Sequence, residues 1–172
     1  MERLKCQRDQ CNSWSLFFYL KSINMSTTKL SEIKLYYKPL RTSRKIITCS
    51  GDAYEQVLHF YDKNTIALQE QFIVLYLNRS NCVLGGYQCS KGTMTGTIVD
   101  VRLVLGVALK ASCCNIIISH NHPSGNLKPS ISDKELTTKL KEAGRLMDIN
   151  ILDHIIVSPN GQYLSLADEG MI

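Results

Sequence analysis

The sequence predicts an α/β protein with a mixed β-sheet flanked by helices. Apolar runs of strand length, such as residues 71–77 and 116–118, are separated by stretches in which apolar residues recur at helical spacing. Hairpin-like patterns lie on both sides of this middle region, which predicts antiparallel as well as parallel neighbours. At 172 residues the chain suits one main domain, and no internal repeat or low-complexity tract interrupts it.

The first 24 residues differ from the rest and are expected to be an extension outside the core. Three basic residues precede a short apolar stretch at 14–20, which resembles a signal peptide but is not followed by a small-residue cleavage site. Met25 has the features of an alternative start. We therefore expect residues 1–24 to be poorly ordered or a start-site artefact, with export as the less favoured alternative.

Residues 25–47 are predicted to hold strands that lead into the core, which spans 48–172. Apolar and polar residues alternate over 30–38, and a second short strand is expected at 44–48. The periodicities after this point predict a helix over about 52–61, strands over 71–77 and 82–89, a helix over 98–110, a strand around 116–118, a helix over 133–147, and strands over 149–158 and 162–166.

Local signals support several of these elements. Ser50 is a candidate N-cap for the first helix. The continuous apolar run 71–77 predicts a strand that is buried on both faces. Gly85-Gly86 would permit a bulge in the strand that follows, and Asn160-Gly161 is typical of a hairpin turn.

Composition favours an ordinary soluble protein, with 44% hydrophobic and 20% charged residues. No stretch approaches the roughly 18 apolar residues of a membrane span. The net charge of +5 permits weak attraction to nucleic acid without indicating it. Seven cysteines, an odd number without a C-x-x-C pair, predict reduced thiols in a cytoplasmic protein and no cysteine zinc site.

The stretch from Ser119 to Asp133 holds the strongest chemical pattern. His120 and His122 are two apart on a predicted strand, so their imidazoles can point to one place. Ser132 and Glu135 have the spacing of a capping box, which places Asp133 in the first turn of the next helix. Two histidines and one aspartate form a three-ligand set with one open position, as in catalytic zinc sites. Isolated histidines are usually structural, but the turn and the helix start supply the geometry that a metal site needs.

The pattern H-x-H-P-x-G-x-x-x-P-S-x-x-D, from His120 to Asp133, resembles the JAMM motif of MPN-domain metalloproteases in the form found in the bacterial RadC family. The similarity continues through residues 140–144, 152–157 and 163–166, and covers about the last hundred residues. It implies an MPN fold, related to that of cytidine deaminases, and a zinc-dependent metallopeptidase or isopeptidase with one zinc ion per chain.

The resemblance also implies roles for residues around the motif. In the family a glutamate on an early strand acts as general base, and Glu70, which opens the 71–77 strand, matches it. Glu55 is the nearest alternative, and a solvated strand-end carboxylate is the structural interpretation of Glu70. Ser130 matches the motif serine that holds the oxyanion, and it could instead cap the helix. His154 is either a partner that orients a metal ligand or a packed core histidine.

The sequence pattern fits other functions less well than this hydrolase. A Ser/His hydrolase would need a base aimed at Ser124 or Ser130, whereas both nearby histidines are assigned to the metal. A zinc deaminase is disfavoured because the H-x-E…P-C-x-x-C signature is absent. The main alternative is a metal-binding accessory module of a DNA-repair or mobile-element system, with little hydrolytic activity.

The expected partner is a protein or peptide substrate, and no membrane partner is expected. Full-length RadC proteins carry an N-terminal region that resembles a helix-hairpin-helix DNA-binding module. Only about fifty residues precede the MPN-like core here, and they lack the Gly-rich hairpins of that module. A nucleic-acid partner or a DNA-repair role is therefore unsupported by the sequence, which identifies neither the substrate nor the oligomeric state.

Overall fold

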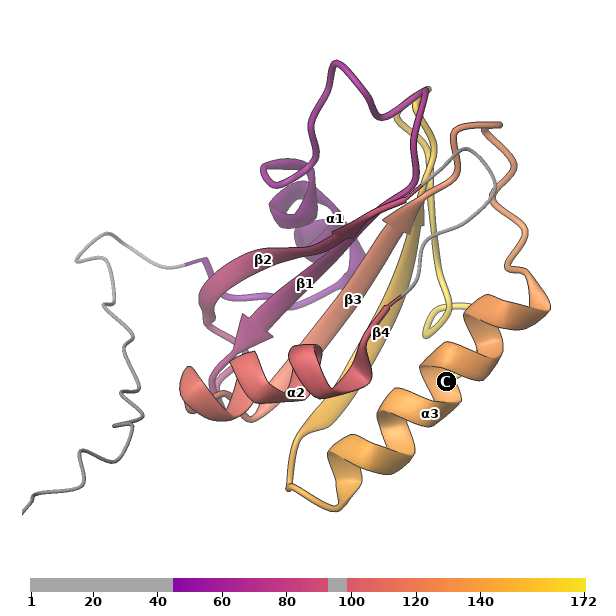
Figure 1. The fold of residues 1–172 in the computed structure, drawn as a ribbon. Helices are drawn as coiled ribbons and strands as arrows, with labels where there is room; N and C mark the ends of the chain where they lie inside the picture. The colour runs from indigo at the N-terminus through magenta and orange to yellow at the C-terminus, as the bar shows by residue number, and fades with distance from the viewer. Residues whose placement is uncertain (1–44, 93–98) are drawn as a thin grey trace, which may run out of the picture. The chain divides into compact units, whose positions relative to one another are not determined.

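The computed structural model describes residues 45–92 and 99–172. Within these ranges the chain forms three helices and five strands (Figure 1). In chain order they are α1 Ser50–Leu58, β1 Gln71–Leu77, β2 Val83–Lys91, α2 Val101–Lys110, β3 Asn115–Asn121, α3 Ile131–Arg145, β4 Asn150–Val157 and β5 Tyr163–Ser165.

The five strands form one mixed sheet in the order β2-β1-β3-β4-β5. β1 is antiparallel to both β2 and β3, and β4 is antiparallel to β5. β3 and β4 are parallel, and α3 is the crossover that a parallel pair requires. The predicted α/β class with a mixed sheet is confirmed.

Helices cover both faces of the sheet, with α1 on one face and α2 and α3 on the other (Figure 1). Every residue of β1 and β3 is buried, so these two strands form the centre of the core. Successive side chains on a strand point to opposite faces. Accordingly Phe72, Val74 and Tyr76 pack with α2 and α3, whereas Ile73, Leu75 and Leu77 pack with α1.

The bounds of β1 are those predicted, but the start of α1 differs. Ser50 is the first helical residue and Cys49 is the N-cap, without a side-chain bond of its own. The carboxylate of Asp52 instead accepts hydrogen bonds from the backbone N–H and the hydroxyl of Thr48, at 2.9 and 2.6 Å. The prediction of Ser50 as N-cap is wrong because an acidic residue in the first turn satisfies the preceding backbone.

The glycine pair in β2 coincides with an irregular and crowded part of the sheet. The β1–β2 register shifts between Tyr76 and Leu77, next to Gly85. A Cβ atom on Gly86 would overlap the ring of Phe60, so a larger residue there would require that ring to move. The strand pairing is thus irregular beside the glycine pair, where the sequence permits a bulge, and the ring of Phe60 packs against Gly86.

Some expectations concern the N-terminal part of the chain. The extension 1–24 and the strand at 30–38 lie outside the described residues. Of the short strand expected at 44–48, the described part forms a single antiparallel bridge between Ile46 and Cys82.

Helix α3, at 15 residues, is the longest in the described ranges. A membrane-spanning helix needs about 20 predominantly apolar residues. None of the helices in the described part of the chain has the length and apolar character for such a crossing.

Two helical glycines test the packing of α3. A Cβ on Gly144 would lie 2.5 Å from the backbone oxygen of Ile149, whereas a Cβ on Gly106 of α2 would meet nothing within 4 Å. We expect Gly144→Ala to lower the free energy of unfolding by about 1–3 kcal/mol through overpacking. Gly106→Ala should raise it by about 0.5–1 kcal/mol. Urea denaturation measures both, and equal stabilisation by the two changes would contradict the close contact between Gly144 and the backbone of Ile149.

Candidate metal centre

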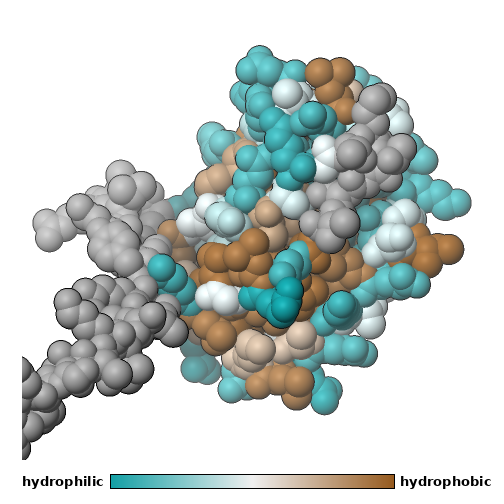
Figure 2. Space-filling model, viewed as in Figure 1, coloured by the Kyte–Doolittle hydropathy of each residue, from teal (hydrophilic) through white to brown (hydrophobic). Residues whose placement is uncertain are grey.

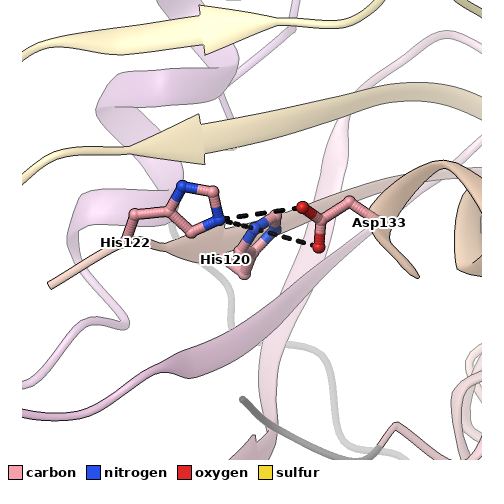
Figure 3. Close-up of side chains that lie close together, drawn as sticks. All are labelled: His120, His122 and Asp133. Atoms are coloured by element: carbon pink, nitrogen blue, oxygen red, sulfur yellow. Dashed lines mark hydrogen bonds and ion pairs between the residues drawn. The ribbon is translucent and has the colours of Figure 1, made fainter. Parts of the chain in front are cut away.

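Three side chains, from the end of β3, the loop after it and the first turn of α3, point toward one another (Figure 3). The Nε2 atoms of His120 and His122 are 2.8 Å apart. Asp133 Oδ1 lies 3.3 Å from His120 Nε2, and Asp133 Oδ2 lies 3.7 Å from His122 Nε2. The structure therefore brings together the three residues that the motif predicted, with ligand atoms all within 4.8 Å of one another.

The sheet fixes the backbone of both histidines. His120 lies in β3, where it is paired with Phe72 of β1 on one side and Ile156 of β4 on the other. His122 follows the last residue of β3, and its N–H donates to the carbonyl of Val157 at 2.9 Å. Because these neighbours belong to the buried core, the histidine positions depend on the whole sheet.

A capping box at the start of α3 orients the aspartate. Ser130 is the N-cap, and its hydroxyl oxygen accepts from the Asp133 N–H at 3.1 Å. The backbone N–H and hydroxyl of Ser130 donate in return to Asp133 Oδ2, at 2.7 and 2.6 Å. The predicted capping box of Ser132 and Glu135 is wrong by two residues, because the helix already begins at Ile131. Asp133 is thus both the third candidate ligand and the closing member of the cap.

Electrostatics favour the charge states that bind a metal. Burial lowers the pKa of His120 to about 4, although Asp133 partly opposes this shift. Burial would raise the pKa of Asp133, but His122, His120 and the Ser130 bonds hold it well below its usual range. The nearby carboxylate of Asp133 raises the pKa of the more exposed His122. At neutral pH the site thus presents an ionised carboxylate and a neutral imidazole at His120, and metals bind these forms.

A chain of hydrogen bonds behind His120 fixes which of its nitrogens faces the cluster. The Thr137 hydroxyl donates to the carbonyl of Asp133 at 2.6 Å, so its oxygen can accept from His154 Nδ1–H at 2.6 Å. His154 Nε2 is then an acceptor for His120 Nδ1–H at 2.8 Å. This arrangement leaves the Nε2 lone pair of His120 directed at the other two ligands. His154, which is fully buried, is therefore a partner of a candidate ligand.

His122 is oriented in the same way by a different acceptor. Its Nδ1 forms a hydrogen bond with the backbone carbonyl of Asn126, in the loop between β3 and α3. A carbonyl can only accept, so Nδ1 carries the proton and Nε2 presents its lone pair. Both histidines thus offer the same nitrogen toward Asp133.

The donor set fits a zinc ion. Two imidazole nitrogens and a carboxylate oxygen are common ligands of catalytic zinc. Tetrahedral ligands at zinc-bond distances of 2.0–2.1 Å are separated by about 3.3 Å. In the cluster the two Nε2 atoms are 2.8 Å apart, and the two different oxygens of Asp133 lie 3.3 and 3.7 Å from them. With one ligand atom taken from each residue, the atoms all lie within 4.8 Å of one another.

Glu70 lies next to this cluster, immediately before β1. Partial burial raises the pKa of its carboxyl; the charge of His122 opposes this shift and that of Asp133 adds to it. Among the described residues no hydrogen bond engages its carboxylate oxygens. Glu55, the alternative, is exposed on α1 and interacts with Lys45. Glu70 thus lies within electrostatic reach of His122 and Asp133, and its role as general base stays a prediction.

Sequence reasoning missed Thr137 and the carbonyl of Asn126. Thr137 is four residues after Asp133, so the helical period places both on one face of α3. That spacing could have indicated a contact with the ligand. The link from Thr137 to His154 could not be found in this way, since it depends on how α3 packs on β4.

Comparisons with known proteins agree with the motif. A family model described as "RadC-like JAB domain" matches residues 47–171. A UPF0758 protein of Flavobacterium johnsoniae is 50% identical over 102 residues, which are 59% of this chain and 44% of that protein. A UPF0758 protein of Syntrophotalea carbinolica is 34% identical over 148 residues, 84% of this chain and 65% of the relative. A third, from Methanosarcina mazei, is 44% identical over 112 residues, 65% of this chain and 48% of the relative. The chain spans about half the length of the relatives it matches.

Thr137 and Thr138, which are adjacent on α3, allow a test of the hydrogen-bond chain that orients His120. Thr137→Val keeps the shape of the side chain but removes the bonds to His154 and Asp133. We expect it to weaken zinc binding about 10- to 100-fold, as is typical for groups that orient a metal ligand. Thr138→Val is the matched control, because Thr138 makes the same type of backbone bond, to Lys134 at 2.9 Å, on the exposed side. Competition with a chromophoric chelator measures both, and equal affinities in the two variants would contradict the support role.

Proposed function

The chain belongs to the family of RadC-like JAB domains, and from this membership and the geometry of the site we propose that it is a zinc-dependent metallopeptidase or isopeptidase. Its substrate would be an amide bond in a protein or peptide. One zinc ion would be held by His120, His122 and Asp133. The free thiols of the described cysteines agree with the cytoplasmic location that we propose with it.

The observation that carries the proposal is the three-ligand cluster with an unbonded carboxylate beside it. Structural zinc sites have four protein ligands, whereas catalytic ones have three. In the described ranges the cluster comprises only His120, His122 and Asp133. Glu70 adds a carboxyl group of raised pKa at the same place. A site that served only to stabilise the fold would have a fourth protein ligand and would not need this acid.

Each residue then has a defined task. Zinc held there would supply Lewis-acid activation of water and of the amide carbonyl. Glu70 would take the proton from the attacking water and return it to the leaving amine, for which a raised pKa is suited. Ser130, whose hydroxyl contacts Asp133 at 2.6 Å, would turn from this bond to donate to the developing oxyanion.

Metal content is the first test of the site. We expect about one zinc per wild-type chain by elemental analysis, and its loss in His122→Ala and in Asp133→Ala, since each removes a ligand. His59→Ala, an exposed histidine after α1, is the control and should keep its zinc. A folded wild-type protein without zinc after metal-replete purification would contradict the proposal.

Hydrolysis separates the enzyme from a metal-binding accessory module. With a quenched fluorescent peptide library as substrate, we expect Glu70→Gln to lower the rate about 10²- to 10⁴-fold while zinc is retained. Glu55→Gln should leave the rate unchanged, because Glu55 is exposed on α1. Full activity in Glu70→Gln would refute the base assignment. A zinc-loaded wild type that cleaves nothing would favour the accessory module.

A further inference from the structure

Asn121, the residue between the two histidines, is fully buried and bonds to the segment that bears Glu70. Its Nδ2 donates to the carbonyls of Ile66 and Gln69, at 2.6 and 2.9 Å. Its Oδ1 accepts from the N–H of Gln71 at 2.7 Å. We propose that Asn121 is a positioning residue that holds the Glu70 carboxylate in register with the metal ligands, an inference that rests on the proposed function.

The two bonds that flank Glu70 explain why one side chain can fix it. The carbonyl of Gln69 belongs to the peptide group before Glu70, and the N–H of Gln71 belongs to the peptide group after it. Only the φ and ψ rotations of Glu70 separate these two planes. Because Asn121 binds both planes, it fixes both rotations and thereby the direction of the Glu70 side chain. The carbonyl of Glu70 also accepts from Gly92 N–H at 2.8 Å.

The position of Asn121 in β3 couples the base to the metal ligands. The backbone pairing of β1 with β3 ends at Phe72 and His120, and Gln71 and Asn121 are the next residues along each strand. Beyond that last pair, the carboxamide of Asn121 joins β3 to β1 through a side-chain hydrogen bond with Gln71. Its neighbours His120 and His122 point to the α3 side, whereas Asn121 alternates to the other face. The end of β3 therefore presents the metal ligands on its α3 side, while Asn121, on its other face, holds the backbone on both sides of Glu70.

The carboxamide is fully used in this arrangement. Both Nδ2 hydrogens are donated, and Oδ1 accepts the N–H of Gln71. A side chain that is smaller, or that can only donate or only accept, cannot make these three hydrogen bonds. Buried polar groups are costly unless every partner is present. A substitution at Asn121 should thus release the segment around Glu70 rather than shift it to another fixed position.

A matched control distinguishes positioning from general stability. Asn115 lies at the opposite end of β3 and is also buried. Its Nδ2 donates to Asn81 Oδ1 at 2.7 Å, and its Oδ1 accepts from Asn150 at 3.0 Å. Asn115→Ala should lower the free energy of unfolding by about as much as Asn121→Ala, without disturbing the metal cluster or Glu70.

The first measurement does not depend on activity. Amide hydrogen exchange by NMR, on the zinc-loaded and the metal-free chain, should show exchange at Gln71 accelerated at least about tenfold in Asn121→Ala and not in Asn115→Ala. Zinc stoichiometry should be unchanged in both variants. Unaltered exchange at Gln71 in Asn121→Ala would overturn the proposal even if the wild type hydrolyses no peptide. This measurement therefore distinguishes a failure of the proposed function from a failure of the positioning role of Asn121.

The second measurement is a double-mutant cycle on peptide hydrolysis. Asn121→Ala should lower kcat about 10- to 100-fold with KM unchanged, which is the effect expected of a misplaced catalytic group. In the Glu70→Gln background it should cause no further loss, because Asn121 acts through Glu70. Equal losses in both backgrounds, or loss of zinc, would overturn the assignment. If the alanine variant does not fold, Asn121→Asp, which keeps the acceptor for Gln71 but neither donor, should show the same non-additivity.

Discussion

The burial of β3 between β1 and β4 is the constraint on which the rest of the structure depends. Every residue of this strand is buried, and it is paired along both edges. Its apolar first half anchors the core, which fixes the direction and register of its polar second half. His120, Asn121 and His122 are therefore positioned by packing that lies well away from them.

The polar side chains at the end of β3 can be buried at little cost because they are completely hydrogen-bonded. In the described ranges no buried side-chain nitrogen or oxygen lacks a partner. The path from His120 through His154 and Thr137 returns to the backbone of Asp133, so it joins two candidate ligands into one network. Such networks specify a unique arrangement because each missing bond would leave a costly buried group. On the surface, Figure 2 shows hydrophobic residues in the middle of one face of the molecule, with hydrophilic residues around them.

The strands and the convergence of the ligands could be predicted from the sequence wherever local periodicity decides the structure. The continuous apolar run gave β1 its correct bounds, and the two-residue spacing of His120 and His122 indicated their convergence. The start of α3 was misplaced because Ser130 with Asp133 and Ser132 with Glu135 both have capping-box spacing. The contacts of Asn121 were beyond prediction, since its partners lie about fifty residues earlier in the chain.

The parallel pairing of β3 with β4 has a consequence for how the chain folds. β1 and β2 can form a hairpin as soon as they are made, but the second edge of β3 is covered only after α3 has crossed the sheet. Until β4 arrives, an apolar strand edge is open to pairing with other chains. Both edges of the strand that carries His120 are therefore closed only when β4 joins the sheet.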